Sequence, residues 1–337
     1  MKRFLLLVLS ALMTLTMVFA VGCNNKSQTD GQTYTFYCPD GAPALSVAKF
    51  INDGENFGIT DTRIDYKVVA SSDIGPALMK AEADFIVIPV NAASKLYKAK
   101  PDSPYVMTAV LTHGNLYLMT SDGTSSLEQL KGKVVGVIGQ GLVPDLTLRA
   151  ILSDNDLLDE VVVGDTATQG KITFRYFEQA PDMIPLLKQG VLTCGLLPEP
   201  AATNLTKVAS NRTWNRLDVQ ELYDSEAKAY PQAVLMVRKS VYQTYKQQID
   251  GMQTMFAQNI EWVKKNTQLA VKAVNANLKQ GVTPSLVEAN INTDVVDNCK
   301  IYYQSSTDAQ TDVINYINKI IAIEPTSAKA ITQDFFA

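Results

Sequence analysis

The residues best suited to bind a ligand stand directly after short apolar runs. Gly139, Gln140 and Gly141 follow the β-branched run 134–138 and precede a helical pattern. Glycines let the backbone turn sharply where a strand ends, and the first N–H groups of the next helix have no intrahelical partners. Such a loop can hold an anionic or strongly polar group. We therefore predict that Gln140 and Gly141 contact a ligand.

A nucleotide cofactor is the first alternative for this loop, because Gly139-x-Gly141 opens the dinucleotide-binding fingerprint. The third glycine of that motif would fall on Pro144. The nearby acidic residues, Asp159 and Glu160, precede a strand-like run instead of ending one. This mismatch argues against dinucleotide binding, and we expect no cofactor.

Further small or polar residues occupy the same kind of position, each after a strand candidate and at a helix start: Gly41, Ala42, Ser71, Ser72 and Asn91. The strand candidates before them are residues 33–38, 65–70 and 85–88. Each of these residues could reach a ligand or only cap its helix. The carboxyl ends of parallel strands meet at the edge where α/β sheets bind ligands, so we expect contact by at least one of Ser71, Ser72 and Asn91.

Glu199 is the one acidic candidate, and it stands before Pro200 at another helix start. A carboxylate is electrostatically favourable at a helix N-terminus in any case. Its functional interpretation is a partner for a cationic or hydroxyl group of the ligand. The sequence leaves both interpretations open.

Few residues in the sequence could support enzyme catalysis. His113 is the only histidine, and Gly-x-Ser-x-Gly, Cys-x-x-Cys and phosphate-binding Walker motifs are absent. Beyond Cys23, three cysteines lie in or beside apolar runs: Cys38, Cys194 and Cys299. Because an odd number cannot close entirely into intrachain disulfides, we interpret them as buried packing residues. We predict neither a metal site nor catalysis.

The N-terminus carries a targeting pattern. Lys2 and Arg3 precede the apolar run 4–19, and small residues lead to Cys23. This series resembles a bacterial lipoprotein signal, in which residues 1–22 are removed and Cys23 is lipidated. Residues 23–32 then form a polar tether. A membrane-spanning anchor and an ordinary cleaved signal are the alternatives.

Length and charge favour a two-lobed globular protein that does not bind nucleic acid. The chain has 337 residues, 46% of them hydrophobic, which is enough for two lobes. Without Lys2 and Arg3, 28 basic and 34 acidic residues remain, a net charge of −6. Nothing in this balance suggests a nucleic-acid partner.

A partial internal repeat predicts how the lobes are built. Asp73-x-x-Pro76 and the segment beginning at Pro89 recur 109 residues later, as Asp182-x-x-Pro185 and the segment beginning at Pro198. Coincidence among common α/β residues is the alternative. Two strand-like runs around residues 113–115 provide a first crossing between lobes, and residues 233–238 provide the return. We predict one lobe from residues 33–118 and 232–337, the other from residues 119–231, and a double-strand hinge.

Three motifs and the lipoprotein signal together resemble a known family. The motifs are Leu130-Lys-Gly-Lys-Val-Val-Gly136 before the glycine loop, Glu82-Ala-Asp84 before a buried strand, and Leu197-Pro-Glu-Pro-Ala201. They are similar to motifs of the solute-binding proteins of ABC importers, in particular the nitrate/sulfonate/taurine and thiamine-precursor group. Members of this group often carry Trp-Glu-Pro where this chain has Pro198-Glu199-Pro200. The missing aromatic argues against a ligand that needs ring stacking.

The resemblance implies a type II periplasmic-binding-protein fold that closes around its ligand. It also implies a lipid-anchored protein on the extracytoplasmic face of the membrane. This protein would be a monomer that delivers a small solute to an ABC permease and ATPase. A sulfonate, a nitrate-like anion and a thiamine-precursor-like solute remain open. A sensor or adhesin lipoprotein of the same fold is the alternative, and an enzyme is a third.

Overall fold

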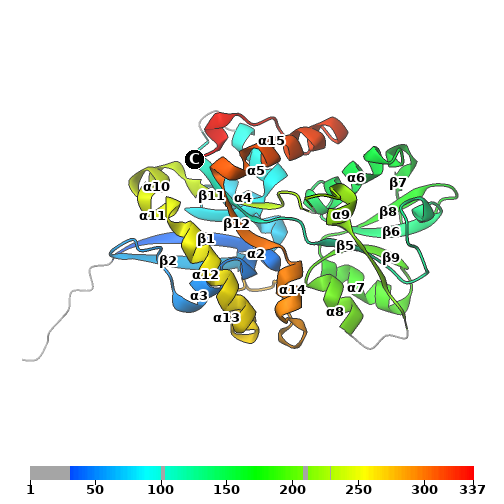
Figure 1. Ribbon diagram of the computed structural model, residues 1–337, viewed down its shortest axis with the longest axis horizontal. Coiled ribbons are helices and arrows are strands. Elements are labelled where there is room, and N and C mark those ends of the chain that lie inside the picture. Colours follow the sequence, from blue (N-terminus) through cyan, green and yellow to red (C-terminus); the bar gives the residue numbers. More distant parts are fainter. Residues whose placement is uncertain (1–30, 100–102, 208–211, 228) are drawn as a thin grey trace, which may run out of the picture. The chain divides into compact units, whose positions relative to one another are not determined.

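The computed structural model describes residues 31–99, 103–207, 212–227 and 229–337. The predicted signal peptide, Cys23 and nearly all of the tether lie outside these residues, so lipidation stays a prediction. Residues 33–337 form one compact unit, in which two sheets carry their own helices (Figure 1). Of the helices described, none is long and apolar enough to cross a membrane.

The first sheet has the strand order β12-β4-β11-β3-β1-β2. Its strands are β1 (Gln32–Pro39), β2 (Thr62–Val69), β3 (Phe85–Pro89), β4 (Tyr105–Thr112), β11 (Ala233–Arg238) and β12 (Ile301–Ser305). β1 runs parallel to β3, whereas β11 is antiparallel to β3 and to β4. β4 is buried along its whole length, as its continuous apolar sequence predicts for a central strand.

Ten α-helices belong to the same part of the chain: α2 (Ala42–Leu45), α3 (Ala48–Asp53), α4 (Ser71–Met79), α5 (Val90–Ala99), α10 (Lys239–Thr244), α11 (Lys246–Asp250), α12 (Met252–Lys265), α13 (Thr267–Ala276), α14 (Thr293–Asn298) and α15 (Ser306–Ile323). Helix α12 is amphipathic and buries Met252, Phe256 and Val263. Two short helices follow β1, since the chain turns at Ser46 and Val47.

The second sheet has the order β10-β5-β9-β6-β8-β7. It contains β5 (Leu116–Thr120), β6 (Lys133–Ile138), β7 (Val161–Val163), β8 (Ile172–Phe177), β9 (Cys194–Pro198) and β10 (Asn215–Asp218), with helices α6 (Val143–Asp154), α7 (Ala180–Gln189), α8 (Ala201–Lys207) and α9 (Val219–Tyr223). Helix α7 packs closely here. A Cβ on Gly136 of β6 would lie 2.3 Å from the sulfur of Met183, so a larger residue would require Met183 to shift.

The predicted repeat is confirmed by strand pairing. In the first sheet β2, β1 and β3 are followed by antiparallel β11, and in the second β8, β6 and β9 are followed by antiparallel β5. Pro89 ends β3 opposite Ala233, and Pro198 ends β9 opposite Leu116. Both prolines thus stand opposite the first residue of the antiparallel strand. The 109-residue offset reflects two lobes of the same design.

Two crossings connect the sheets. Residues 113–115 join β4 to β5, and residues 224–232 lead from α9 to β11. The side chain of Gln220 bonds both backbone groups of Leu116, at 2.8 and 3.0 Å, and Gln232 Nε2 donates to Asn115 Oδ1 at 2.9 Å. The predicted boundary between residues 118 and 119 falls inside β5, which pairs with the second sheet, so a boundary after Asn115 fits the strands better.

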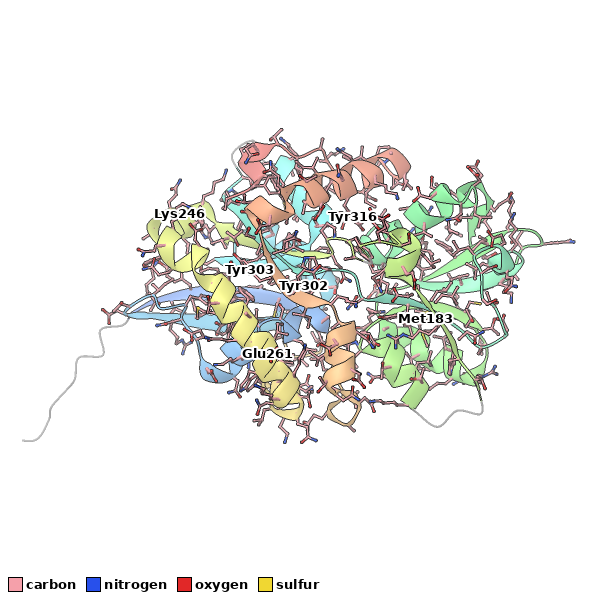
Figure 2. The ribbon with its side chains drawn as sticks, viewed as in Figure 1. Met183, Lys246, Glu261, Tyr302, Tyr303 and Tyr316 are labelled. Carbon is pink, nitrogen blue, oxygen red and sulfur yellow. The ribbon has the colours of Figure 1, made fainter. Side chains whose placement is uncertain are left out.

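A third contact between the two halves was not foreseen from the sequence. Helix α15, which belongs with the first sheet, packs against α6 of the second. Tyr316 is labelled in Figure 2. Its hydroxyl group lies 2.7 Å from that of Thr147, and its ring stacks on that of Tyr230. One buried apolar cluster therefore includes residues of both sheets.

Candidate functional site

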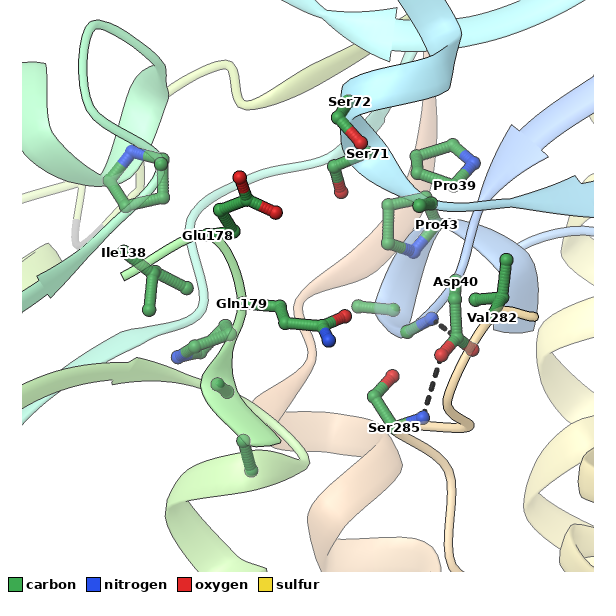
Figure 3. Close-up of a pocket in the computed structure, with 18 of the residues that line it drawn as sticks. Pro39, Asp40, Pro43, Ser71, Ser72, Ile138, Glu178, Gln179, Val282 and Ser285 are labelled. Atoms are coloured by element: carbon green, nitrogen blue, oxygen red, sulfur yellow. Dashed lines mark hydrogen bonds between the residues drawn. The ribbon is translucent and has the colours of Figure 1, made fainter. Parts of the chain in front are cut away.

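A cavity of about 450 Å³ lies between the two sheets (Figure 3). Its walls are the carboxyl ends of strands and the starts of the helices that follow them, together with the hinge and a loop before α14. The lining segments are residues 39–43, 70–73, 138–139, 142–144, 178–181, 198–201, 232–233, 279–283 and 285, with Pro89 and Asn115. The strand ends therefore meet as predicted for an α/β ligand site.

Seven prolines line this cavity: Pro39, Pro43, Pro89, Pro144, Pro181, Pro198 and Pro200. Pro39, Pro89 and Pro198 end strands, and Pro43, Pro144 and Pro181 lie in the first two positions of α2, α6 and α7. Proline has the backbone angle that a helix start requires but no N–H group. Each of these three helix starts therefore offers a ligand one backbone N–H donor fewer than a helix start without proline.

Four predicted site residues line the cavity from the first lobe. Gly41 and Ala42 are buried at the start of α2, and Ser71 and Ser72 are exposed at the start of α4. Neither serine side chain caps α4. Gly41 has φ of +100°, and a Cβ there would lie 3.5 Å from Ser285 Oγ. Whether these residues contact a ligand stays a prediction, but their hydroxyls and small surfaces face the space a ligand would need.

Three other predicted residues, Gln140, Gly141 and Asn91, do not line the cavity. The N–H of Gly141 donates to Asp145 Oδ2 at 2.9 Å, and its carbonyl accepts from Asn91 Nδ2 at 3.0 Å. Asn91 also donates to the carbonyl of Ser327 at 3.0 Å. This corner of the glycine loop is thus held against the first lobe, and Gly139 and Leu142 line the cavity in its place.

Glu199 lines the cavity only with part of its surface, because its side chain is buried in the second lobe. The carboxylate accepts the hydroxyl of Thr203 at 2.8 Å and its N–H at 3.1 Å, and pairs with Arg216 at 2.5 Å. The Arg216 guanidinium lies 3.4 Å from the centre of the Tyr117 ring. Glu199 thus has the structural role that the sequence allowed, as a helix cap and ion-pair partner, and a contact with the ligand stays a prediction.

Several hydrogen-bond acceptors at the cavity were not predicted from the sequence. Asp40 accepts the N–H of Gly41 at 2.8 Å and that of Ser285 at 2.6 Å. Burial raises the pKa of the Asp40 carboxyl, although these hydrogen bonds oppose the shift. Glu178 and Gln179 point from the second lobe toward Ser71 and toward Asp40, respectively (Figure 3).

One signal could have identified Glu178 and Gln179. Adding the offset of 109 to positions 69 and 70, which precede Ser71, gives positions 178 and 179. The loop 279–285 had no comparable signal, because a distant backbone contact brings it to the cavity. The N–H of Lys279 donates to the carbonyl of Val68 at 2.7 Å.

The cavity has an unusual charge inventory. Lys279 is the only basic residue among those that line it, and its Nζ lies 3.0 Å from Asp73 Oδ2. Within the same lining set there is no arginine and no aromatic residue. Glu178 is exposed and forms no ion pair or hydrogen bond within the part of the chain that the structure describes. The cavity therefore presents uncompensated carboxylates, not uncompensated cations.

The histidine and the cysteines lie elsewhere. Cys38, Cys194 and Cys299 are free and buried, as predicted for packing residues, and burial raises the pKa of each thiol. His113 is buried at the hinge, with its ring 3.5 Å from the ring of Tyr302. Across the described ranges, no three His, Cys, Asp or Glu side chains gather as a set that could hold a metal ion.

The comparisons with known proteins rest on structure. No family model matches the sequence, and no curated protein matches it. An ABC transporter protein from Parabacteroides distasonis is 18% identical, with a TM-score of 0.71 over 91% of this chain and 99% of that one.

Two further solved structures are similar. The ligand-binding component of an ABC-type import system from Staphylococcus aureus, with zinc bound, is 14% identical, with a TM-score of 0.56 over 91% and 96% of the two chains. The alkanesulfonate-binding protein SsuA from Xanthomonas axonopodis, bound to MOPS, is 11% identical, with a TM-score of 0.58 over 89% and 96%. The chain has the two-lobed α/β fold of periplasmic binding proteins, as its sequence predicted.

Proposed function

We propose that this protein is a lipid-anchored, extracytoplasmic solute-binding protein that captures a small molecule between its lobes and delivers it to an ABC permease and ATPase. The fold and its structural neighbours support the receptor role, and the sequence motif around Cys23 supports the anchor. No chemical reaction is part of the proposal.

The observation that carries this proposal is the shared cavity. Residues at the carboxyl ends of strands in both sheets line one space beside the hinge. A ligand that touches both lobes stabilises the closed arrangement by as much as it binds that arrangement more tightly than the open one. Closure of this kind is how hinged binding proteins enclose a solute. A volume near 450 Å³ fits a small organic molecule or a hydrated ion.

Native mass spectrometry of the purified protein tests the proposal. We expect a non-covalent mass that disappears when the protein is unfolded and refolded. Small-angle scattering should then show a smaller radius of gyration when the released solute is added back. A protein that retains no solute and does not contract with concentrated cell extract would contradict a binding role, and conversion of the solute would identify an enzyme.

A further inference from the structure

The unpartnered polar groups at the cavity include two acceptors, Glu178 and Gln232, and one hydroxyl, that of Ser285, which can donate or accept. Glu178 forms no ion pair among the described residues. The Oε1 atom of Gln232 is fully buried at the hinge and accepts no hydrogen bond, although its Nε2 donates to Asn115. The exposed carboxylate of Glu178 can accept hydrogen bonds from a ligand that brings donors.

Asp40 adds acceptor capacity from the opposite lobe. Each of its carboxylate oxygens accepts one backbone N–H, and a carboxylate has about four lone-pair positions. Two positions therefore remain for a ligand. The hydrogen bonds to Gly41 and Ser285 also fix the carboxylate, so it needs no reordering when a ligand arrives.

The donors that an anion would need are few. The Lys279 ammonium is paired with Asp73, and prolines remove one N–H from each of three helix starts. Buried anions in proteins depend on such backbone donors or on an arginine fork. The donors left at the cavity are uncharged: the hydroxyls of Ser71, Ser72 and Ser285, the Gln179 amide and the first N–H groups of α4.

We propose that the solute is an organic cation, a primary or secondary alkylammonium, held between Asp40 of the first lobe and Glu178 of the second. This inference rests on the proposed function and narrows it. Two carboxylates on opposite lobes repel each other when the lobes approach, and a cation between them removes that repulsion. The charge of the solute is thus what makes closure favourable.

The nature of the lining restricts the type of cation. A quaternary ammonium has no N–H to donate and is usually recognised by aromatic faces, which are absent from the residues lining this cavity. An amine with N–H groups can instead donate to Asp40 and Glu178. We therefore expect discrimination between protonated amines and choline-like solutes.

Calorimetry with 1,4-diaminobutane, choline and 1-butanesulfonate tests the inference. Of the three compounds, we expect only 1,4-diaminobutane to give heat of binding. In Glu178→Gln its affinity should fall by about tenfold or more, since a charged hydrogen bond becomes a neutral one. Asp182→Asn is the control, because Asp182 is an exposed carboxylate on α7 that does not line the cavity. Its affinity should stay within about twofold of wild type, as screened surface charges contribute little.

Asp40→Asn should also weaken amine binding. Because Asp40 also accepts the N–H of Ser285, the unfolding transition of this variant shows whether the substitution has destabilised the protein as well. Glu178→Gln avoids that ambiguity, because Glu178 is exposed and has no partner to lose. Binding of 1-butanesulfonate, unchanged amine affinity in Glu178→Gln, or no amine binding at all would overturn the cation assignment. A bound anion found by native mass spectrometry would overturn it while leaving the receptor function intact.

Discussion

Glu178 and Glu199 are both acidic residues near helix starts, but the fold uses them differently. The carboxylate of Glu199 is fully buried, and Thr203 and Arg216 satisfy it. Glu178 is exposed and keeps all of its acceptor capacity. Sequence position alone favoured Glu199, since it precedes a helix in a motif that resembles a known family. The two carboxylates differ in their hydrogen-bond and ion-pair partners. Local sequence does not show these partners, because Arg216 is 17 residues away in the chain.

Only part of the candidate site could be predicted from residue types. Gly41, Ala42, Ser71 and Ser72 line the cavity because a strand followed by small or polar residues reliably ends at this edge. Gly141 and Asn91 have the same local pattern but face each other, and that pairing depends on how the two lobes contact. Local sequence cannot specify a contact between residues that are 50 positions apart in the chain.

His113 leads to a prediction about pH. Burial lowers its pKa from an ordinary value near 6.5 to about 4, so the folded protein keeps it neutral where the unfolded chain protonates it. Stability from this residue is complete above about pH 6.5 and is lost as the pH falls toward 4. At pH 5 the loss should be about 2 kcal/mol.

Urea unfolding of wild type and His113→Gln at pH 7 and pH 5 measures this effect. The variant loses the ring contact with Tyr302 and should be less stable at pH 7, but its stability should fall less between pH 7 and pH 5. For each protein, the free energy of unfolding at pH 5 is subtracted from the value at pH 7. These two differences are then compared, because the contributions of other titrating groups cancel between the proteins. Equal differences in the two proteins would show that His113 carries no such linkage.

At the scale of elements, the strands and helices follow from apolar periodicity, and the repeat gives their arrangement. Phe85–Ile88 and Cys194–Leu197 are buried on both faces, and proline follows each. The pattern of β12 was less informative, because only Ile301 is fully buried in this edge strand. The packing of α15 against α6 was also beyond prediction, because an apolar stripe identifies a buried face but not its partner.

The hinge yields a prediction at the same scale. Gly114 has φ of +74°, and a Cβ there would lie 2.6 Å from Tyr230 Cε1. Gly114→Ala combines an unfavourable backbone conformation with overpacking, and we expect a loss of about 2–4 kcal/mol. Differential scanning calorimetry should show a marked fall in Tm.

Gly123→Ala is the matched control for the hinge variant. Gly123 has φ of +85°, but a Cβ there would meet nothing within 4 Å. Only the backbone cost remains, about 1 kcal/mol. If the two variants lose the same stability, the contact between the hinge turn and Tyr230 has no energetic role. A larger loss in Gly114→Ala shows that the first crossing is packed tightly against the return segment.

At the scale of the whole molecule, the lobes are joined by more than two strands. Tyr316 of α15 contacts Thr147 and Tyr230, so this side of the molecule holds the lobes together while the cavity lies at the ends of the strands. The closure that we propose would require α15 and α6 to shift or to act as a pivot. Packed side-chain interfaces favour a few discrete arrangements over continuous bending, which suits the proposed receptor with an open and a closed state.

The cavity is built wholly from residues between Pro39 and Ser285, so ligand capture and membrane attachment should be separable. After removal of residues 1–22 the net charge is −6, which gives no attraction to anionic lipids. In the proposed function, retention at the membrane would therefore come from acyl chains on Cys23. We expect Cys23→Ala to move the protein from the membrane fraction to the soluble fraction while its ligand affinity stays at the wild-type value, as measured by fractionation and calorimetry. Unchanged membrane association would remove the lipid anchor from the proposed function, and reduced affinity would show that the anchor and the cavity are coupled.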